Sequence, residues 1–295
     1  MSVIRSDSRT QADIRPLTMK SSVSSRSDGS AEFSFGDLKV LGAVTGPAEA
    51  RIRDEKPNEA TIELNVVPVC GLPGPPHKAF SHSIKLFFAP LILRKKYPRS
   101  LIQINLQTLS KPSDRWSKTF STAALDQTPA SRFDESKSVS EKAALINAAS
   151  LALLESGIAM RGVGLAIGVA VIPASATQSK TSDADLVVLD PNPSEEACAR
   201  SLHLVGYYFG QEFEQDSKPD NQNAKVAFCE SQGSFDYNQL QTIFNYALSA
   251  SQQIFAFVRR SVEVQYEKET EDTPISQQST KSTKEEKAKK KKKKV

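Results

Sequence analysis

Hydrophobic and polar residues follow two different periods in the first half of the chain. Alternation at every second position is typical of strands with one buried face. It predicts a hairpin at 33–44 and strands at 61–69 and 100–108. From Ser83 the apolar residues instead recur three and four positions apart, which predicts one apolar face of a helix that ends before Pro98.

The second half of the pattern begins with a helix. Ser138 and Glu141 have the spacing of a capping box, and the Ala- and Leu-rich segment after them ends at Gly157. Because its side chains are small, this helix can pack closely, and we expect it at the centre of the fold. Further apolar segments predict strands at 162–172, 185–190, 200–209 and 224–231. A long amphipathic helix is expected from about Asp236 to Tyr266.

This order of elements predicts a single α+β domain at 30–266, with mixed sheets and packed helices. Segments that show neither the strand period nor the helix period have too few apolar residues to offset the conformational entropy lost on folding. We expect a flexible leader at 1–29, inserted loops near 109–139 and 210–223, and a disordered Lys-rich tail at 267–295.

The net charge of +4 is unevenly distributed. Residues 281–295 hold nine lysines and two glutamates, a net of +7, which leaves 4 − 7 = −3 for the rest. The tail has three interpretations: RNA binding through phosphates, a nuclear-import signal, or a solvated low-complexity end. Its lysines are not interleaved with aromatic residues, which argues against base stacking by the tail.

Sequence signals for common cofactors and metals are missing. Three widely spaced cysteines and three histidines form no zinc pattern, so no metal is expected, and a reducing compartment is the simplest interpretation. Neither nucleotide-binding glycine motif occurs, nor does a GxSxG elbow, and we expect no cofactor. No stretch of 18 apolar residues and no signal peptide is found, which predicts a soluble, non-secreted protein without a membrane partner.

Four motifs carry a resemblance to the ribonuclease PH family, in family order over about residues 27–265. They are SDGSAEFSFGDLKVLGAVTGPAEARI at 27–52, KKYPRS at 95–100, INAASLALLESGIAMRG at 146–162, and LVVLDPNPSEE at 186–196. PVCGLPG at 68–74 and the DPxxxEE form of the last motif resemble one branch, the RNA exosome ring subunit of the ribosomal RNA-processing protein 46 type.

The resemblance implies a fold of the ribosomal protein S5 domain 2-like type and a place in a ring of six related chains around an RNA channel. The implied partners are other ring subunits, especially the processing-protein 43 type, together with S1/KH cap subunits, associated hydrolytic exonucleases and RNA. Such a subunit would support 3′-to-5′ RNA processing and degradation, including rRNA maturation and mRNA decay, in the nucleus, the nucleolus and the cytoplasm.

Comparison with active relatives predicts that the phosphorolytic site is damaged. Their phosphate-binding G-T-R motif aligns with Ser140, Glu141 and Lys142, which puts a carboxylate beside the anion and replaces a bidentate arginine. An arginine pair before their first helix aligns with Pro75-Pro76. An arginine of the 109–139 insertion, such as Arg132, remains an alternative source of the missing charge.

The carboxylates of the late motif are retained. Asp190 aligns with the first catalytic carboxylate of the family and Glu196 with the second. Asp190, Glu196 and Lys142 are therefore vestigial candidates, and no catalytic residue is assigned. Lys78, Arg99 and Lys142 are the candidate RNA contacts.

Ordinary structural roles compete with these assignments. An Asp before Pro at a strand end is commonly a turn former, and Arg99 is as plausible an ion-pair partner inside the domain. Three functions stay open: a non-catalytic exosome ring subunit, which we favour, an active phosphate-dependent 3′-to-5′ exoribonuclease, and a free-standing RNA-binding protein.

Overall fold

The computed structural model describes residues 5, 9–112, 138–173, 185–210 and 224–272, with side chains described through 267. The chain divides into two compact units, 1–255 and 256–295. Among the described residues, the strands and all helices except the second part of the last one belong to the first unit. No helix in the described part of the chain is long and apolar enough to cross a membrane.

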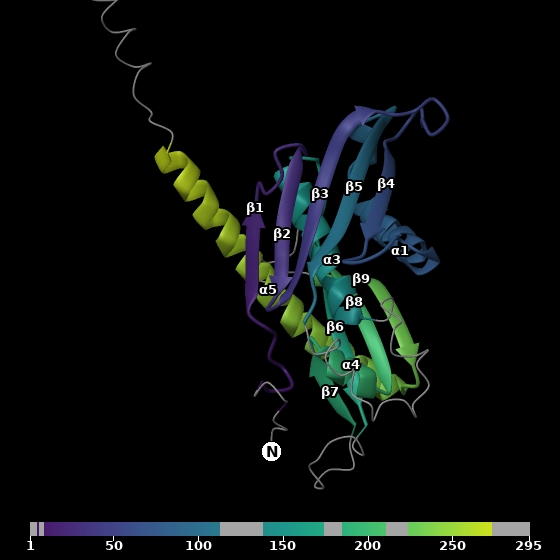
Figure 1. The fold of residues 1–295 in the computed structure, drawn as a ribbon, viewed down its shortest axis with the longest axis vertical. Coiled ribbons are helices and arrows are strands. Elements are labelled where there is room, and N and C mark those ends of the chain that lie inside the picture. The colour runs from purple at the N-terminus through teal and green to yellow at the C-terminus, as the bar shows by residue number, and fades with distance from the viewer. Residues whose placement is uncertain (1–4, 6–8, 113–137, 174–184, 211–223, 273–295) are drawn as a thin grey trace, which may run out of the picture. The chain divides into compact units, whose positions relative to one another are not determined.

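The described strands of the first unit form two sheets (Figure 1). The five-stranded sheet has the order β1-β2-β3-β5-β4, with β1 Leu17–Ser21, β2 Gly29–Phe35, β3 Leu38–Glu49, β4 Thr61–Val67 and β5 Ser100–Ser110. The four-stranded sheet has the order β7-β6-β8-β9, with β6 Gly162–Ile172, β7 Leu186–Leu189, β8 Ser201–Gly210 and β9 Ala224–Gly233. Pairing is antiparallel except between β4 and β5, so the first sheet is mixed and the second is antiparallel.

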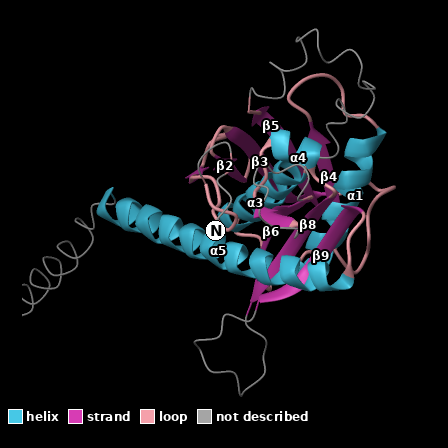
Figure 2. Ribbon diagram, turned by 90° about the horizontal axis from the view of Figure 1, so that it is seen from below, coloured by secondary structure: helices cyan, strands magenta, loops and turns pink. Residues whose placement is uncertain are grey.

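Helices complete the architecture. They are α1 Pro75–Leu91, the short 3₁₀ helix η1 Arg94–Lys96, α3 Val139–Glu155, α4 Pro193–Cys198 and α5 Tyr237–Asp272. Figure 2 shows β6, β8 and β9 side by side with helices around them. The α+β class expected from the sequence is confirmed.

Helix α3 lies between the two sheets and is the centre of the unit. It packs on β2 and β3 of one sheet and on β6 and β8 of the other, and Val139–Leu153 is buried throughout. Gly42 permits the close approach, since a Cβ there would lie 2.6 Å from the carbonyl oxygen of Ala148. The one buried amide of α3, Asn147, is satisfied by the backbone of Ala166 on β6, at 2.8 and 3.0 Å.

Three predicted boundaries are wrong. Helix α1 begins at Pro75, not at Ser83, because proline at the first helical position suits a helix start and the polar turn before Phe80 carries little apolar signal. It also ends at Leu91, because Ile92 is extended, and the expected last turn before Pro98 is the separate 3₁₀ helix η1. Helix α5 continues to Asp272, beyond the expected end at Tyr266, so the tail does not begin at 267. The Lys-rich remainder from 273, residues 113–137 of the first predicted loop and residues 211–223 of the second lie outside the described residues.

The predicted flexible leader is also wrong for the part that the structure describes. Leu17–Ser21 forms β1 and pairs with β2, while Arg5 and Arg15 are buried. The backbone N–H of Leu189 donates to the carbonyl of Gln11 at 3.0 Å, which covers part of the edge of β7. The composition did not reveal that this segment is ordered, because Arg5 and Arg15 are held by carboxylates that lie far away in the sequence.

A buried histidine on β8, His203, should make the stability of the fold depend on pH. His203 is fully buried, and its ring nitrogens hydrogen-bond the hydroxyls of Ser231 at 2.8 Å and Ser201 at 2.9 Å. Burial lowers the pKa of His203 from 6.5 to about 4. Below about pH 6.5 the unfolded chain therefore binds a proton that the folded chain rejects.

We expect the free energy of unfolding to fall between pH 6.5 and 4 by up to about 1.4 kcal/mol per pH unit more than in His203→Gln. Urea unfolding at a series of pH values measures this difference. His82→Gln, at an exposed position of α1, is the matched control and should follow the parent chain. Parallel pH profiles for the parent chain and His203→Gln would show that His203 is not responsible.

Candidate functional site

The carboxylate of Asp190 is enclosed at the end of β7. Its backbone N–H donates to the carbonyl of Gly168 at 2.9 Å, and its φ of +46° turns the chain away from the sheet. Aspartate tolerates this left-handed conformation better than most residues. Asp190 is 0 % exposed, so solvent does not reach it in the folded chain.

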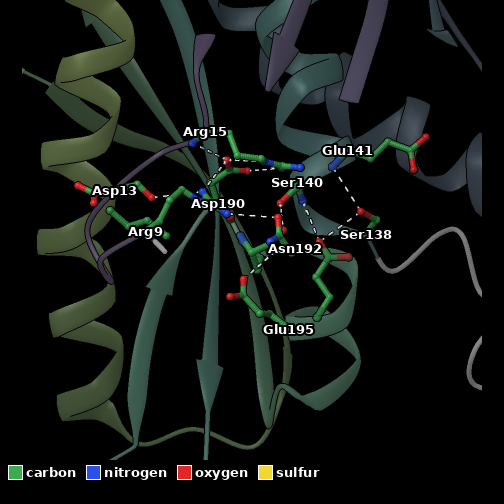
Figure 3. A network of polar contacts seen from close by, with 12 residues as sticks. Arg9, Asp13, Arg15, Ser138, Ser140, Glu141, Asp190, Asn192 and Glu195 are labelled. Atoms are coloured by element: carbon green, nitrogen blue, oxygen red, sulfur yellow. Dashed lines mark hydrogen bonds and ion pairs between the residues drawn. The ribbon is translucent and has the colours of Figure 1, made fainter. Parts of the chain in front are cut away.

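Arg15 binds both oxygens of this carboxylate (Figure 3). Its Nε donates to Oδ2 at 2.7 Å and its Nη2 to Oδ1 at 2.5 Å, a bidentate pair, while its backbone N–H donates to Oδ2 at 3.0 Å. Arg9 adds a longer contact to Oδ2 at 3.4 Å. The carboxylate oxygens are thus held by the chain's own N-terminal segment, and Asp190 has the geometry of a structural ion-pair partner.

Arg5 and Arg9 extend this network to the turn after β7. Arg5 forms a second bidentate pair, with Glu195 at 2.7 and 2.5 Å, and donates to the carbonyls of Leu189 and Asp190, both at 2.9 Å. Arg9 donates to Oδ1 of Asn192 at 3.2 Å. We call Arg5, Arg9, Arg15, Asp190 and Glu195 the arginine clamp. It attaches the N-terminal segment to the end of β7 and the start of α4.

Glu196 connects α4 to the first turn of α3. Its Oε1 accepts hydrogen bonds from the hydroxyl of Ser138 and from the backbone N–H of Ser140, each at 3.2 Å. Ser140 in turn donates its hydroxyl to the carbonyl of Pro191 at 2.9 Å. A carboxylate is favourable near a helix N-terminus, so Glu196 stabilises the start of α3. The same contact uses a backbone donor that would otherwise be available to an anion.

A cavity of about 220 Å³ lies on the other side of this turn, among β4, α1, α3 and β9. Its lining includes Pro76 and His77 of α1, Glu141 and Lys142 of α3, and Glu230 of β9. The structure thus brings the Pro75-Pro76 position and the Glu141-Lys142 position to one place, although 65 residues separate Pro76 from Glu141. Asp190 and Glu196 are not among the lining residues.

Charges in this cavity are paired within the chain. Lys142 Nζ lies 2.6 Å from Glu230 Oε1 and 5.1 Å from the ring centroid of Phe80. Glu141 accepts from the hydroxyl of Thr108 at 2.7 Å and lies 3.0 Å from Lys111 Nζ. Two carboxylates and one ammonium group line the cavity, a balance that disfavours an entering anion.

Two of the three predicted RNA contacts, Lys78 and Arg99, are not among the residues that line this cavity. Lys78 is exposed on α1, and Arg99, with its side chain 73 % exposed, lies 3.4 Å from Glu55. Lys142 is 8 % exposed and its ammonium group is engaged by Glu230, a poor position for contact with RNA. Arg132 falls outside the described residues. No group of three or more potential metal ligands occurs in the described ranges.

Sequence reasoning missed Arg5, Arg9, Arg15 and Glu230. The three arginines occur in a polar segment, where charge alone does not identify a distant partner. Arg15 precedes Pro16 and the strand β1, which is a weak signal of order. Glu230 lies in a strand with a largely exposed pattern, and nothing in its neighbourhood points to Lys142.

The arginine clamp predicts a large stability effect for a small chemical change. Asp190→Asn retains the side-chain shape and the tolerance for positive φ but removes the negative charge that pairs with the buried Arg15. Loss of one partner of a buried ion pair costs about 3–5 kcal/mol, so we expect a decrease of that size in urea unfolding. Arg15→Met combined with Asp190→Asn should recover part of the loss.

The control is Arg53→Met, since Arg53 is 90 % exposed and lies 3.7 Å from Asp54. A surface pair of this kind contributes at most about 1 kcal/mol. Equal effects of Asp190→Asn and Arg53→Met would contradict a structural role for the clamp.

Comparisons with known proteins agree with this architecture. The family model described as the 3′ exoribonuclease family, domain 1 (RNase PH) matches residues 13–159. The chain is similar to the exosome complex component RRP46 of Saccharomyces cerevisiae, with 29% identity over 236 residues, covering 80% of this chain and 90% of that protein. The exosome complex component rrp46 of Schizosaccharomyces pombe is 34% identical over 143 residues, covering 48% of this chain and 52% of that protein.

A solved structure supports the fold. The crystal structure of rice (Oryza sativa) Rrp46 superposes with a TM-score of 0.67 at 22% identity, covering 88% of this chain and all of that chain. The model match identifies residues 13–159 as domain 1 of the ribonuclease PH family of 3′ exoribonucleases, and the curated relatives and the shared fold agree with it.

Proposed function

We propose that this protein is a non-catalytic ring subunit of an RNA exosome, which helps to line the RNA channel and supports 3′-to-5′ RNA processing and degradation. The observation that carries the non-catalytic part is the internal pairing of the charged residues at the site. Asp190 is bound by Arg15 and Lys142 by Glu230, so neither presents a free charge to substrate. The names of the similar yeast proteins, each an exosome complex component, support the assembly.

The proposal includes specific partners. They are other ribonuclease PH-like ring subunits, especially the processing-protein 43 type, the S1/KH cap subunits, associated hydrolytic exonucleases, and RNA. In this arrangement the chain contributes a stable scaffold, and hydrolysis of RNA is carried out by the associated nucleases.

We expect a purified ring that contains this chain to show no phosphate-dependent RNA degradation. Phosphorolysis releases nucleoside diphosphates, so the measurement is diphosphate release from a single-stranded RNA with and without inorganic phosphate. Lys142→Gln should leave the rate unchanged, because Lys142 is committed to Glu230. Phosphate-dependent release that Lys142→Gln abolishes would instead identify an active exoribonuclease.

Co-purification distinguishes the assembled subunit from a free-standing RNA-binding protein. Pull-down of the tagged full chain, with and without RNase treatment, should recover ring and cap subunits in both cases. Recovery of a monomer that binds only RNA would reject the ring assignment.

We further propose action in the nucleus and nucleolus as well as the cytoplasm, with the lysine run 289–294 as the import signal. Substitution of these six lysines by glutamine in a fluorescently tagged full chain should lower the nuclear-to-cytoplasmic ratio. Replacement of Lys95 and Lys96, which lie in the folded unit, serves as the charge control. An unchanged nuclear-to-cytoplasmic ratio would show that the lysine run is not an import signal.

A further inference from the structure

A contact between two rings lies at the end of the four-stranded sheet where β9 leads into α5. The ring centroids of His203 and Phe235 are 4.8 Å apart at an interplanar angle of 78°, an edge-to-face contact. His203 is 0 % exposed, whereas Phe235 is 37 % exposed. Because the exposed ring touches the buried ring, Phe235 lies on the solvent side of His203 and covers it.

The segment that carries Phe235 is short and loosely attached. β9 ends at Gly233, whose φ of +105° favours glycine, and α5 begins at Tyr237. Asp236 is fixed, since its backbone N–H donates to Gln239 Oε1 at 3.0 Å and its Oδ1 accepts the N–H of Tyr237 at 2.8 Å. Phe235 itself forms no hydrogen bond with another described residue. Its ring can therefore move outward without breaking a hydrogen bond.

The hydrogen bonds of His203 suit a neutral ring. A neutral imidazole has one donor and one acceptor, so one of the two serine hydroxyls at its nitrogens accepts and the other donates. Protonation turns both nitrogens into donors, and the hydroxyl that donated must then direct its hydrogen elsewhere. Ser201 is 1 % exposed and forms no other hydrogen bond with a described residue, while Ser231 lies 3.6 Å from Cys229 Sγ. The closed site thus fits the neutral ring better than the protonated one.

The interior around His203 offers no counter-charge, and burial alone lowers its pKa to about 4. β6, which pairs with β8, contains no ionisable residue, and residues 237–255 of α5 contain no charged one. Tyr207 and Cys229 share the face of the sheet with His203, whereas Glu230 is on the opposite face. The charged groups at this end of the sheet are engaged with one another or with the start of α5: Asp185, Arg200 and Asp236. A proton on His203 is therefore stabilised only by water.

We propose that Phe235 is a lid over His203, and that protonation of His203 opens this lid, so that the segment between β9 and α5 moves outward as the pH falls. The open form binds the proton because its imidazolium ring is hydrated, and the closed form excludes it. The device is independent of the proposed function, since it involves neither the cavity beside α3 nor the arginine clamp.

The first test is an NMR titration of the histidine rings in the purified full chain between about pH 7.5 and 4. The other two histidines, His77 and His82, serve as internal references. Phe235→Ala should raise the measured pKa of His203 by at least about one unit, because water then reaches the ring. Tyr237→Ala removes a second exposed aromatic ring, 74 % exposed, beside the same segment and should titrate like the parent chain.

The parent chain tests the opening itself. The nuclear Overhauser contact between the rings of His203 and Phe235 should weaken in step with protonation. The contact between Phe209 and Phe255, stacked at 4.6 Å, should persist and shows that the chain is still folded. This measurement needs no substitution, so it decides the matter even if Phe235→Ala does not fold.

Three results would overturn the inference. One is an equal pKa of His203 in the parent chain and in folded Phe235→Ala. Another is a contact between His203 and Phe235 that survives protonation. The third is the simultaneous loss of both ring contacts, which would show global unfolding in place of a local opening.

Discussion

The buried ion pair between Arg15 and Asp190 is the interaction on which the site depends. A carboxylate with 0 % exposure is tolerated only when its charge is matched and its oxygens are hydrogen-bonded, and Arg15 does both. Through this pair the N-terminal segment is attached to the end of β7, and Arg5 secures the adjoining turn through Glu195. Asp190, which aligns with an active-site carboxylate of the family, therefore serves here to attach the N-terminal segment to the end of β7.

The start of α3 unites the clamp with the cavity. Glu196 holds the first turn from the side of the clamp, and Lys142 reaches Glu230 on the side of the cavity. The backbone N–H of Ser140 is thus bound to Glu196, and the ammonium group of Lys142 to Glu230. The fold of a 3′ exoribonuclease family is thus combined with charged residues that pair within the chain, which agrees with the proposed non-catalytic role.

Much of the fold was predictable because its signals are local. Alternation identified β2 to β5, and the capping box located α3, whose N-cap Ser138 accepts the backbone N–H of Glu141. The start of α1 was missed because its first two turns are polar and proline-rich. The order of the N-terminal segment was missed for a different reason, since its stability comes from contacts about 175 residues apart in sequence.

The sequence by itself determined the class of fold and the position of the central helix. Those features follow from periodicity and capping, which act within a few residues. The lysine in place of arginine at position 142 is what the resemblance to the family's phosphate-binding motif implies. Only the tertiary structure decided which carboxylate meets which cation: Asp190 meets Arg15, and Glu230 meets Lys142. Charge pairing depends on distance in space, and the folding of strands distant in sequence onto the two sides of α3 brings these groups within hydrogen-bond range.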